Sequence, residues 1–319
     1  MKKAFMIIGA ILLVVGIGLL AYVGAVADLD LSNLSSAKYV TSTHPVDGKV
    51  RNIEIDVDEA DIDFQPSEDG TTSVVIKEQE KVKHSVSEKE GTLRIEEEDH
   101  RKWIDHLGFF TNRMTITVYL PAAEYQSLQI KTATGDVAIS NAYTFGEAEI
   151  TTDTGDVRCN AHVREQCTVH TDTGDISIDG MHVGDLDLSV STGHIDLHQV
   201  ECGGTLTTKV STGKVWLTEV NCGALVSKGD TGDITLKNVT AAHNFDIERS
   251  TGDVTFDHSD AAEITVQTST GDVTGTLCSE KIFFAETSTG HTQVPKTMTG
   301  GKCEIKTSTG DVHIEIEEN

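Results

Sequence analysis

Positive charge is scarce in this sequence. Twenty-five lysines and arginines stand against 51 aspartates and glutamates, which gives a formal net charge of −26 at pH 7. Because so acidic a surface is repelled by phosphate backbones, the charge balance argues against nucleic acid as a partner. Common catalytic fingerprints are missing too: no P-loop, dinucleotide-binding fingerprint or Ser/His/Asp set occurs at a usable spacing.

Cysteines are few and scattered, and no two of them form a CxxC or a Cys/His metal spacing. This excludes a disulfide framework and a zinc site of the usual type. Cys202 and Cys222 lie at equivalent places in the repeat described below, so a disulfide between them or two buried, reduced thiols are both compatible with the sequence. The full set is Cys159, Cys167, Cys202, Cys222, Cys278 and Cys303.

What the chain does have is a repeat. The phrase Thr-Gly-Asp-Val recurs, with small variations, from residue 131 to the C-terminus at intervals of 19 or 20 residues. A constant period of this size is typical of a stacked repeat fold. The repeat glycines are Gly135, Gly155, Gly174, Gly193, Gly213, Gly232, Gly252, Gly271, Gly290 and Gly310.

Each repeat contains at least two short strands. The residues two and four places after each glycine are mostly aliphatic, as in Val137 and Ile139, and the residue between them is mostly polar. This alternation is typical of a strand with one buried face. A strand, crossover helix and second strand need roughly 30 residues or more, so the interval is too short for a helix. The sequence therefore predicts an all-β fold, a single-stranded parallel β-helix or β-solenoid with turns of 19–20 residues.

The N-terminus is organised differently. Residues 4–27 are uncharged and mostly apolar, and as a helix they would span about 36 Å, enough for a hydrocarbon core of roughly 30 Å. Lysines precede this run and Asp28 follows it, which favours a cytoplasmic N-terminus. We expect residues 1–28 to be a transmembrane signal-anchor, and cleavage after Ala25-Val26-Ala27 is the alternative.

Three further segments follow the predicted anchor. Residues 29–49 are polar and aperiodic and are interpreted as a linker. Residues 50–130 keep the strand alternation without the regular glycines, which predicts degenerate β turns that cap the coil, with a charged turn region at Lys77–Glu90. Residues 131–319 are the predicted ten-repeat solenoid. Its last strand, Asp311–Ile316, is expected at the open end, blunted by terminal charges or joined to a second copy in an end-to-end homodimer.

A family resemblance rests on these repeats. Met114–Pro121 reads MTITVYLP, Leu128–Val137 reads LQIKTATGDV, and Ser-Thr-Gly-Asp-Val phrases follow. From about Ile53 onward the chain resembles the bacterial putative-adhesin family of β-strand-repeat proteins, a domain of unknown function. The resemblance implies a right-handed β-helix in the bacterial envelope, and some members resemble membrane-anchored accessories of envelope-stress systems. It carries no catalytic residues over to this chain.

An acidic column is predicted at the repeat corner. Stacked carboxylates about 5 Å apart repel one another, and a divalent cation could relieve the repulsion. However, Asp is also a favoured turn residue because of its own hydrogen bonds. Turn chemistry and a weak calcium or magnesium site are therefore alternatives, and no other cofactor is expected. The candidate cation ligands of the column are Asp136, Asp156, Asp175, Asp233, Asp253 and Asp272; His194, Lys214 and His291 interrupt the column, and Asp311 ends it.

Aromatic residues are few, and two places stand out. The segment 96–113 concentrates Trp103, Phe109 and Phe110, either as a loop packed over the open end of the core or as an exposed patch for a partner. Trp216 follows inward Val215 and is expected to face solvent, where it could stack on a sugar ring or simply be exposed.

These features favour a non-enzymatic module of the cell envelope. We expect a binding scaffold, a putative adhesin, displayed outside the bacterial cell membrane, with an envelope protein or glycan as its partner. A regulatory or sensory accessory of an envelope-stress system is the first alternative. A glycan-active β-helix enzyme is the second, and the constant turn length disfavours it because no insertion is left to form a cleft.

Overall fold

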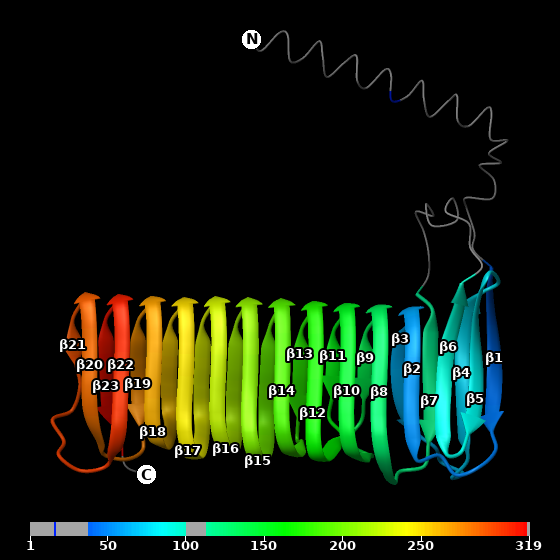
Figure 1. The fold of residues 1–319 in the computed structure, drawn as a ribbon, viewed down its shortest axis with the longest axis horizontal. Coiled ribbons are helices and arrows are strands. Elements are labelled where there is room, and N and C mark those ends of the chain that lie inside the picture. Colours follow the sequence, from blue (N-terminus) through cyan, green and yellow to red (C-terminus); the bar gives the residue numbers. More distant parts are fainter. Residues whose placement is uncertain (1–15, 17–37, 100–112, 318–319) are drawn as a thin grey trace.

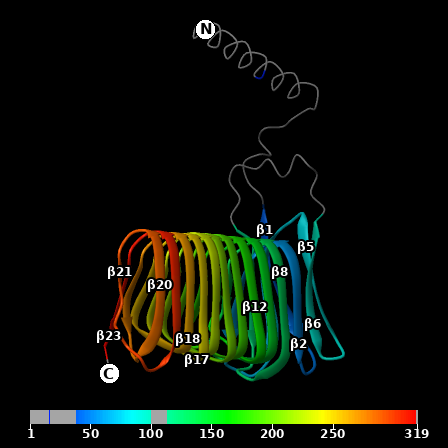
Figure 2. The same ribbon diagram turned by 60° about the vertical axis from the view of Figure 1, so that its left-hand side comes forward.

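The protein is a rod of stacked β turns closed at one end by additional strands (Figure 1). The structure, a computed structural model, describes residues 16, 38–99 and 113–317. In the described part each turn is flattened, so one set of parallel strands forms the front layer and a second set forms the back layer. Figure 2 shows the turns following one another along a single axis. The prediction of an all-β parallel solenoid is confirmed.

The strands of the rod repeat in pairs and then fuse. Short strands alternate with long ones up to β14, and from β15 to β18 a single strand runs through most of each turn. In order they are β8 (Glu124–Thr134), β9 (Val137–Ile139), β10 (Thr144–Thr154), β11 (Val157–Cys159), β12 (His162–Thr173), β13 (Ile176–Asp179), β14 (His182–Thr192), β15 (Ile195–Thr212), β16 (Val215–Thr231), β17 (Ile234–Thr251), β18 (Val254–Thr270), β19 (Val273–Leu277), β20 (Lys281–Thr289), β21 (Thr292–Gln293), β22 (Gly301–Thr309) and β23 (Val312–Ile316).

The strands form because equivalent residues of successive turns stack in register. Val157 pairs with Val137 on one side and with Ile176 on the other, and all three are buried. The same positions in other turns supply further aliphatic residues, so continuous ladders fill a narrow core that a single repeat could not bury alone. Cys159, Cys167 and Cys303 occupy such inward positions and are fully buried, as expected for small apolar side chains.

The glycine column is required by the spacing of the turns. A Cβ on Gly155 would lie 2.0 Å from the carbonyl oxygen of Gly135, and its φ of +151° is rare for other residues. The Gly135 amide donates to the Thr154 carbonyl at 2.9 Å, and this contact repeats along the column. The threonine before each glycine thus links the turns through its carbonyl.

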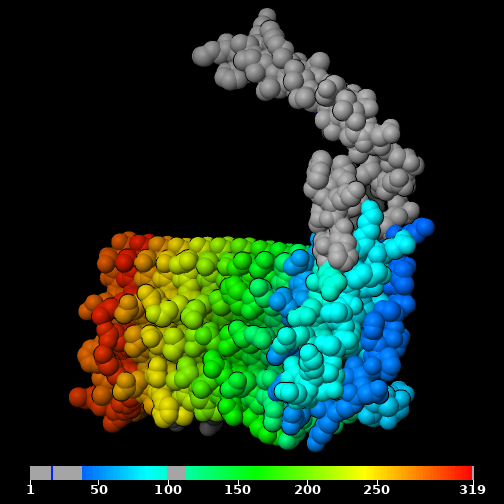
Figure 3. All heavy atoms as spheres, turned by 45° about the vertical axis from the view of Figure 1, so that its right-hand side comes forward, coloured from blue at the N-terminus to red at the C-terminus, as the bar shows by residue number. Residues whose placement is uncertain are grey.

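The N-terminal cap contains one solenoid turn, a further parallel pair of strands and three antiparallel strands. Figure 3 shows this end of the molecule as the blue and cyan part of the surface. β2 and β3 form the first turn, because they pair in parallel with β8 and β9 and place Ala60 beside Gly135. β6 and β7 continue the two layers, and β5, β4 and β1 then pair antiparallel. The bounds are β1 (Tyr39–Val46), β2 (Asn52–Glu59), β3 (Asp61–Pro66), β4 (Thr72–Gln79), β5 (Val82–Lys89), β6 (Thr92–Asp99) and β7 (Thr115–Leu120).

Two details of the sequence interpretation are wrong at this end. Part of the predicted linker, residues 29–49, forms strand β1, because Tyr39 and Val46 pack against the core beside β4. The predicted charged turn region Lys77–Glu90 contains strand β5, whose Val82 and His84 are buried. Most charges of this stretch lie at exposed or half-exposed positions of paired strands, and Glu78 and His84 are buried, so the charge density did not indicate a loop.

The last repeats follow one another along the rod in a different order from their order in the sequence. β22 lies between β18 and β20, and β23 lies between β19 and β21. The final repeat is therefore inserted, and the repeat of Gly290 forms the end of the rod. The prediction that Asp311–Ile316 lies at the open end is wrong, because both sides of β23 are paired.

One buried charge interrupts the core ladders. Arg249 is 3% exposed and stacks on Gly229, where a Cβ would lie 2.2 Å from its Nη1. Nη2 donates to Ser227 at 2.8 Å, whereas Nε has no partner in the described part of the chain. Burial lowers the pKa of Arg249 to about 10. Other turns place threonine or valine at this position, as in Val210 and Thr268.

Restoring the ladder is expected to stabilise the protein. The double variant Gly229→Val, Arg249→Thr should raise the free energy of unfolding by roughly 1–4 kcal/mol, because it replaces a buried charge that has no ion pair among the described residues by ordinary ladder residues. Urea denaturation followed by circular dichroism measures the change. Arg249→Thr alone leaves a void over Gly229 and should gain less. A double variant less stable than the parent would contradict the argument.

Candidate binding groove

The acidic column links the turns through hydrogen bonds. Each of its carboxylates accepts a bond through Oδ1 from the backbone amide of the equivalent residue in the neighbouring turn, at 2.7–3.1 Å. His194 continues the pattern, because its Nδ1 lies 2.9 Å from the Lys214 amide. The Lys214 side chain cannot accept a hydrogen bond from the amide of the next turn. Its Nζ instead lies 2.9 Å from Asp233 and lowers the pKa of that carboxyl group. The predicted aspartates are Asp136, Asp156, Asp175, Asp233, Asp253 and Asp272.

The same geometry bears on the predicted cation site. Within residues 38–99 and 113–317, no group of three or more His, Cys, Asp or Glu side chains is arranged to hold a metal ion. One oxygen of each stacked aspartate is already committed to a backbone amide, and a hard cation prefers six or more oxygen ligands. The column thus resembles a structural ladder, and the weak calcium or magnesium site has no ligand cluster to support it.

Trp216 lies on the outer surface, as predicted. It is 37% exposed, and its indole packs against the His194 imidazole with ring centroids 5.2 Å apart. The other predicted contact residues, Trp103, Phe109 and Phe110, lie outside the described residues. So does the predicted anchor, apart from Gly16, and no helix in the described part is long and apolar enough to cross a membrane.

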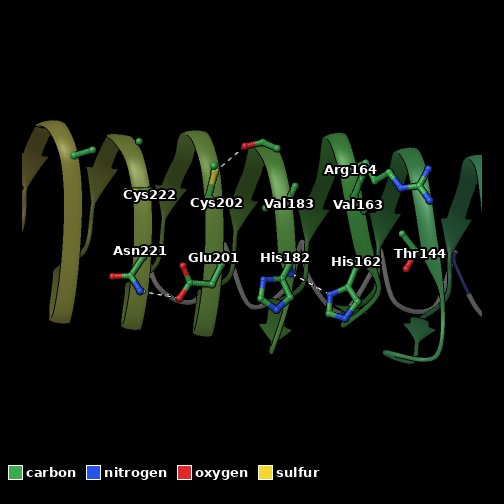
Figure 4. A pocket seen from close by; sticks show the side chains of 14 residues that line it. Thr144, His162, Val163, Arg164, His182, Val183, Glu201, Cys202, Asn221 and Cys222 are labelled. Carbon is green, nitrogen blue, oxygen red and sulfur yellow. Dashed lines mark hydrogen bonds between the residues drawn. The ribbon is translucent and has the colours of Figure 1, made fainter.

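A groove runs along a different corner of the rod (Figure 4). Two hollows of about 820 and 650 Å³ lie at equivalent positions of successive turns, because Asn221, Thr240 and Asp260 are register partners. We call this surface, from Thr144 on β10 to Asp260 on β18, the corner groove. Those seven strands are separated by about 4.8 Å each, so the groove is about 30 Å long.

The floor and one wall of the corner groove are made by small residues. Val163, Val183, Cys202, Cys222, Ala241 and Ala261 form the floor and are nearly buried. The chain bulges just beyond these residues, where register shifts occur in every turn from β10 to β17. The wall at the bulge has little or no side chain in five consecutive turns: Gly184, Gly203, Gly223, Ala242 and Ala262.

The opposite wall carries one polar side chain per turn, which we call the polar rail: Thr144, His162, His182, Glu201, Asn221, Thr240 and Asp260. Neighbours on the rail contact one another. The imidazoles of His162 and His182 lie 5.0 Å apart, and burial, and then the charge of His182, lower the pKa of His162. Asn221 donates to Glu201 at 2.7 Å and accepts a bond from Thr240. The rail therefore offers both donors and acceptors along the groove.

Two free thiols lie on the floor. Cys202 and Cys222 are register partners, as the sequence predicted, but they are not bridged. Their side chains point the same way from adjacent parallel strands, and Sγ of each donates to a different carbonyl, of Gly184 and Thr240. Burial raises the pKa of Cys222 to about 12 and also raises that of Cys202. Protonated thiols are poor nucleophiles and poor metal ligands, so they act here as apolar floor.

Comparison with protein families identifies the fold's relatives. The model of the Toastrack DUF4097 family matches residues 50–209 and 203–319, which together span most of the chain. The chain belongs to the Toastrack DUF4097 family. None of the curated proteins matches it.

Solved structures of similar fold include one named a putative adhesin from Parabacteroides distasonis. It is 10% identical, with a TM-score of 0.52, and the match covers 86% of this chain and 98% of that one. A putative adhesin from Bacteroides fragilis is 17% identical, with a TM-score of 0.40 and coverage of 88% and 98%. At such identity the first likeness shows a shared fold.

The sequence analysis did not predict the corner groove of this Toastrack chain. A signal was present, because a Gly or Ala stands ten places after the repeat glycine in five consecutive repeats. Gly203 is informative: a Cβ there would have only an ordinary 3.8 Å contact, so the backbone does not require glycine. By contrast, a Cβ on Gly184 would lie 2.2 Å from a carbonyl oxygen. Because Gly203 has no side chain, space is left in the corner groove at this position.

Proposed function

We propose that this protein is a non-enzymatic binding module displayed outside a bacterial cell membrane, and that the corner groove holds a linear glycan. The apolar segment 4–27, with lysines before it and Asp28 after it, supports a membrane anchor with a cytoplasmic N-terminus. The name of the Parabacteroides relative, a putative adhesin, is consistent with a role in surface binding.

The observation that carries the proposal is the alignment of two hollows, at equivalent positions of successive turns, along the corner groove. A straight groove about 30 Å long suits an extended polymer better than a compact molecule. Its floor is apolar, which suits the C–H faces of sugar rings, and its polar rail offers one hydrogen-bonding group per turn. A linear glycan carries hydroxyl groups at regular intervals, so it can use both surfaces along its length.

The negative charge of the protein limits which glycans can bind in the corner groove. The rail includes Glu201 and Asp260, of which Asp260 is neutralised by the buried Lys281 at 2.6 Å, and the whole chain carries a net charge of −26. Polyanionic polymers are repelled by such a surface. Arg164, at the start of the groove, is paired with Glu124 and offers little compensation. The expected ligands are therefore neutral or amino-sugar glycans.

Chemistry at the groove favours binding without turnover. The thiols of Cys202 and Cys222 are held in the protonated form, and the lowered pKa of His162 keeps its imidazole neutral. The polar rail lies along one wall, so its groups do not face an acid or base partner across a bound chain. Such a wall can orient a glycan, whereas hydrolysis usually requires two carboxyl groups on either side of the scissile bond.

Filling the groove tests the function. Ala242→Leu combined with Gly203→Leu places apolar volume in the groove, because Ala242 lines it and a Cβ on Gly203 would meet only a 3.8 Å contact. Isothermal titration of the full chain in mild detergent with a length series of chitin oligosaccharides should show saturable binding that strengthens with length. The double variant should weaken it at least about tenfold, because the chain loses contact with the floor.

Ala138→Leu is the matched control, since Ala138 lies on strand β9, away from the groove. It should bind as the parent does. Equal losses in the control and the groove variant would place binding elsewhere on the rod. If no neutral or amino-sugar oligosaccharide binds, or if phospholipid vesicles without glycan bind instead and the groove variant abolishes that binding, the glycan proposal is wrong.

A further inference from the structure

The C-terminal end of the rod is an open sheet edge. β20 pairs with β22 on one side, and no strand lies beyond it in the described part of the chain. Its partner in the back layer, β21, pairs with β23 on one side in the same way. In Figure 1 these strands form the left-hand edge of the molecule. Their outer backbone amides and carbonyls are available for pairing.

The open edge is unusually apolar. Five large hydrophobic residues of the described chain are exposed, and three lie at this end: Ile282 (39%), Phe284 (54%) and Met298 (91%). Phe283 and Ala285 point inward but are only half-buried, because no further turn covers them. The end of the core and the outer face of β20 thus form one apolar surface, which we call the terminal edge.

The two ends of the rod differ in whether further strands cover the last turn. At the N-terminal end, β6 and β7 continue the layers and the antiparallel strands β5, β4 and β1 close them. At the C-terminal end nothing comparable exists in the described residues. An uncovered edge strand that reads Ile-Phe-Phe-Ala and lacks proline is a template for pairing with another strand.

Charge favours a meeting of two copies at this end. Residues 280–306 carry four lysines and three glutamates, and Lys281 is buried and paired with Asp260, so the surface of this end is near neutral in a chain whose net charge is −26. Two such acidic rods repel each other along their sides but not at the terminal edge. This end is therefore the place where a second copy can approach at the lowest electrostatic cost.

We infer that two copies of this protein join through the terminal edge, β20 to β20, as a two-fold dimer. An axis perpendicular to the front sheet makes the two β20 strands antiparallel and keeps inward residues inward. The register centred on Phe283 places Ile282 opposite Phe284 of the second copy. The same axis brings β21 beside β21, so both layers continue across the interface and the two cores become one.

The loop between β21 and β22 fits this arrangement. It extends beyond the edge at the end where β20 begins (Figure 1), and it carries Met298. The two-fold axis places the two loops at opposite ends of the joined strands. Each loop then packs against the second copy near Gly290, so Met298 is covered without a clash between loops.

A charge at the edge tests the dimer. The full chain in mild detergent should sediment as a dimer in analytical ultracentrifugation. Phe284→Lys places two lysines in the interface and should raise the dissociation constant at least about tenfold. Trp216→Lys, an equivalent change at an exposed aromatic on the side of the rod, is the control and should remain dimeric. Unchanged circular dichroism spectra show that both variants are folded.

Three results would overturn the inference. They are a monomeric parent, a dimer that Phe284→Lys leaves intact, and an open-ended polymer, which would require a head-to-tail contact in place of a two-fold one. The inference does not depend on glycan binding, because the corner groove and the terminal edge are tested by different variants.

Discussion

Gly213→Ala is expected to lower the free energy of unfolding by about 2–6 kcal/mol. A Cβ on Gly213 would lie 1.7 Å from the carbonyl oxygen of Gly193, and the φ of +146° is a region that other residues rarely adopt. Backbone strain of this kind costs about 1–3 kcal/mol, and overpacking costs a similar amount. Because each turn contacts only its neighbours, the defect should separate the rod into two halves that unfold at different urea concentrations.

Gly203→Ala is the matched control. It adds the same methyl group ten residues away, where the nearest atom lies at 3.8 Å and φ is not positive. Its stability should stay within about 0.5 kcal/mol of the parent. The measurement is urea denaturation of the full chain followed by circular dichroism. If both substitutions had equal effects, glycine would be required along this chain for flexibility and not for the close stacking of turns.

The repeat period predicted positions within a turn better than it predicted which turns are neighbours. Val137 and Ile139 are buried as the alternation indicated, because inward positions depend only on the residues of one turn. The insertion of β22 between β18 and β20 depends on a choice between repeats that carry the same ladder. Period and composition do not distinguish these neighbours, so the location of the open edge could not be predicted from them.

The sequence analysis took part of the N-terminal cap for a charged turn because it missed the hairpin of β5 and β6. Glu90 and Gly91 both have positive φ, the backbone conformation of a two-residue hairpin turn. Alternating residues flank this turn on both sides, so a hairpin of β5 and β6 was available in the sequence. The many charges of the segment obscured it, because most of them lie at exposed or half-exposed positions and the buried ones, Glu78, His84 and Glu97, compensate one another.

The buried cluster of His84, Glu78 and Glu97 holds the strands of the N-terminal cap together. The His84 side chain is fully buried, with Nδ1 3.0 Å from Glu78 and Nε2 3.6 Å from Glu97. Glu97 also accepts the backbone amides of Asp58 and Glu59 at 2.9 and 3.2 Å. The cluster thus ties β4, β5 and β6 to the end of β2. His84→Leu leaves the buried Glu97 without a cation and leaves Glu78 paired only with Lys83 at 2.9 Å, so it should destabilise the cap by about 3–5 kcal/mol.

The same cluster sets the pH dependence of the cap. Burial alone would lower the pKa of His84, but its contacts with Glu97 and Glu78 raise it, and the net pKa lies above the ordinary 6.5. For the two glutamates, burial alone would raise the pKa, and hydrogen bonds bring it below the ordinary 4.5. Stability from His84 is complete below 6.5 and is lost as pH rises through its folded pKa. Stability from the glutamates is complete above 4.5 and is lost as pH falls through theirs.

The cap should therefore be most stable between about pH 4.5 and 6.5. Hydrogen exchange of peptides from β4 to β6, measured by mass spectrometry across this range, gives the local stability. In His84→Leu the loss above pH 6.5 should disappear, since no proton leaves the cluster there. His170→Leu removes an exposed histidine 3.1 Å from Asp172 and should change little. If His84→Leu kept the loss at high pH, another group would control the stability of the cap.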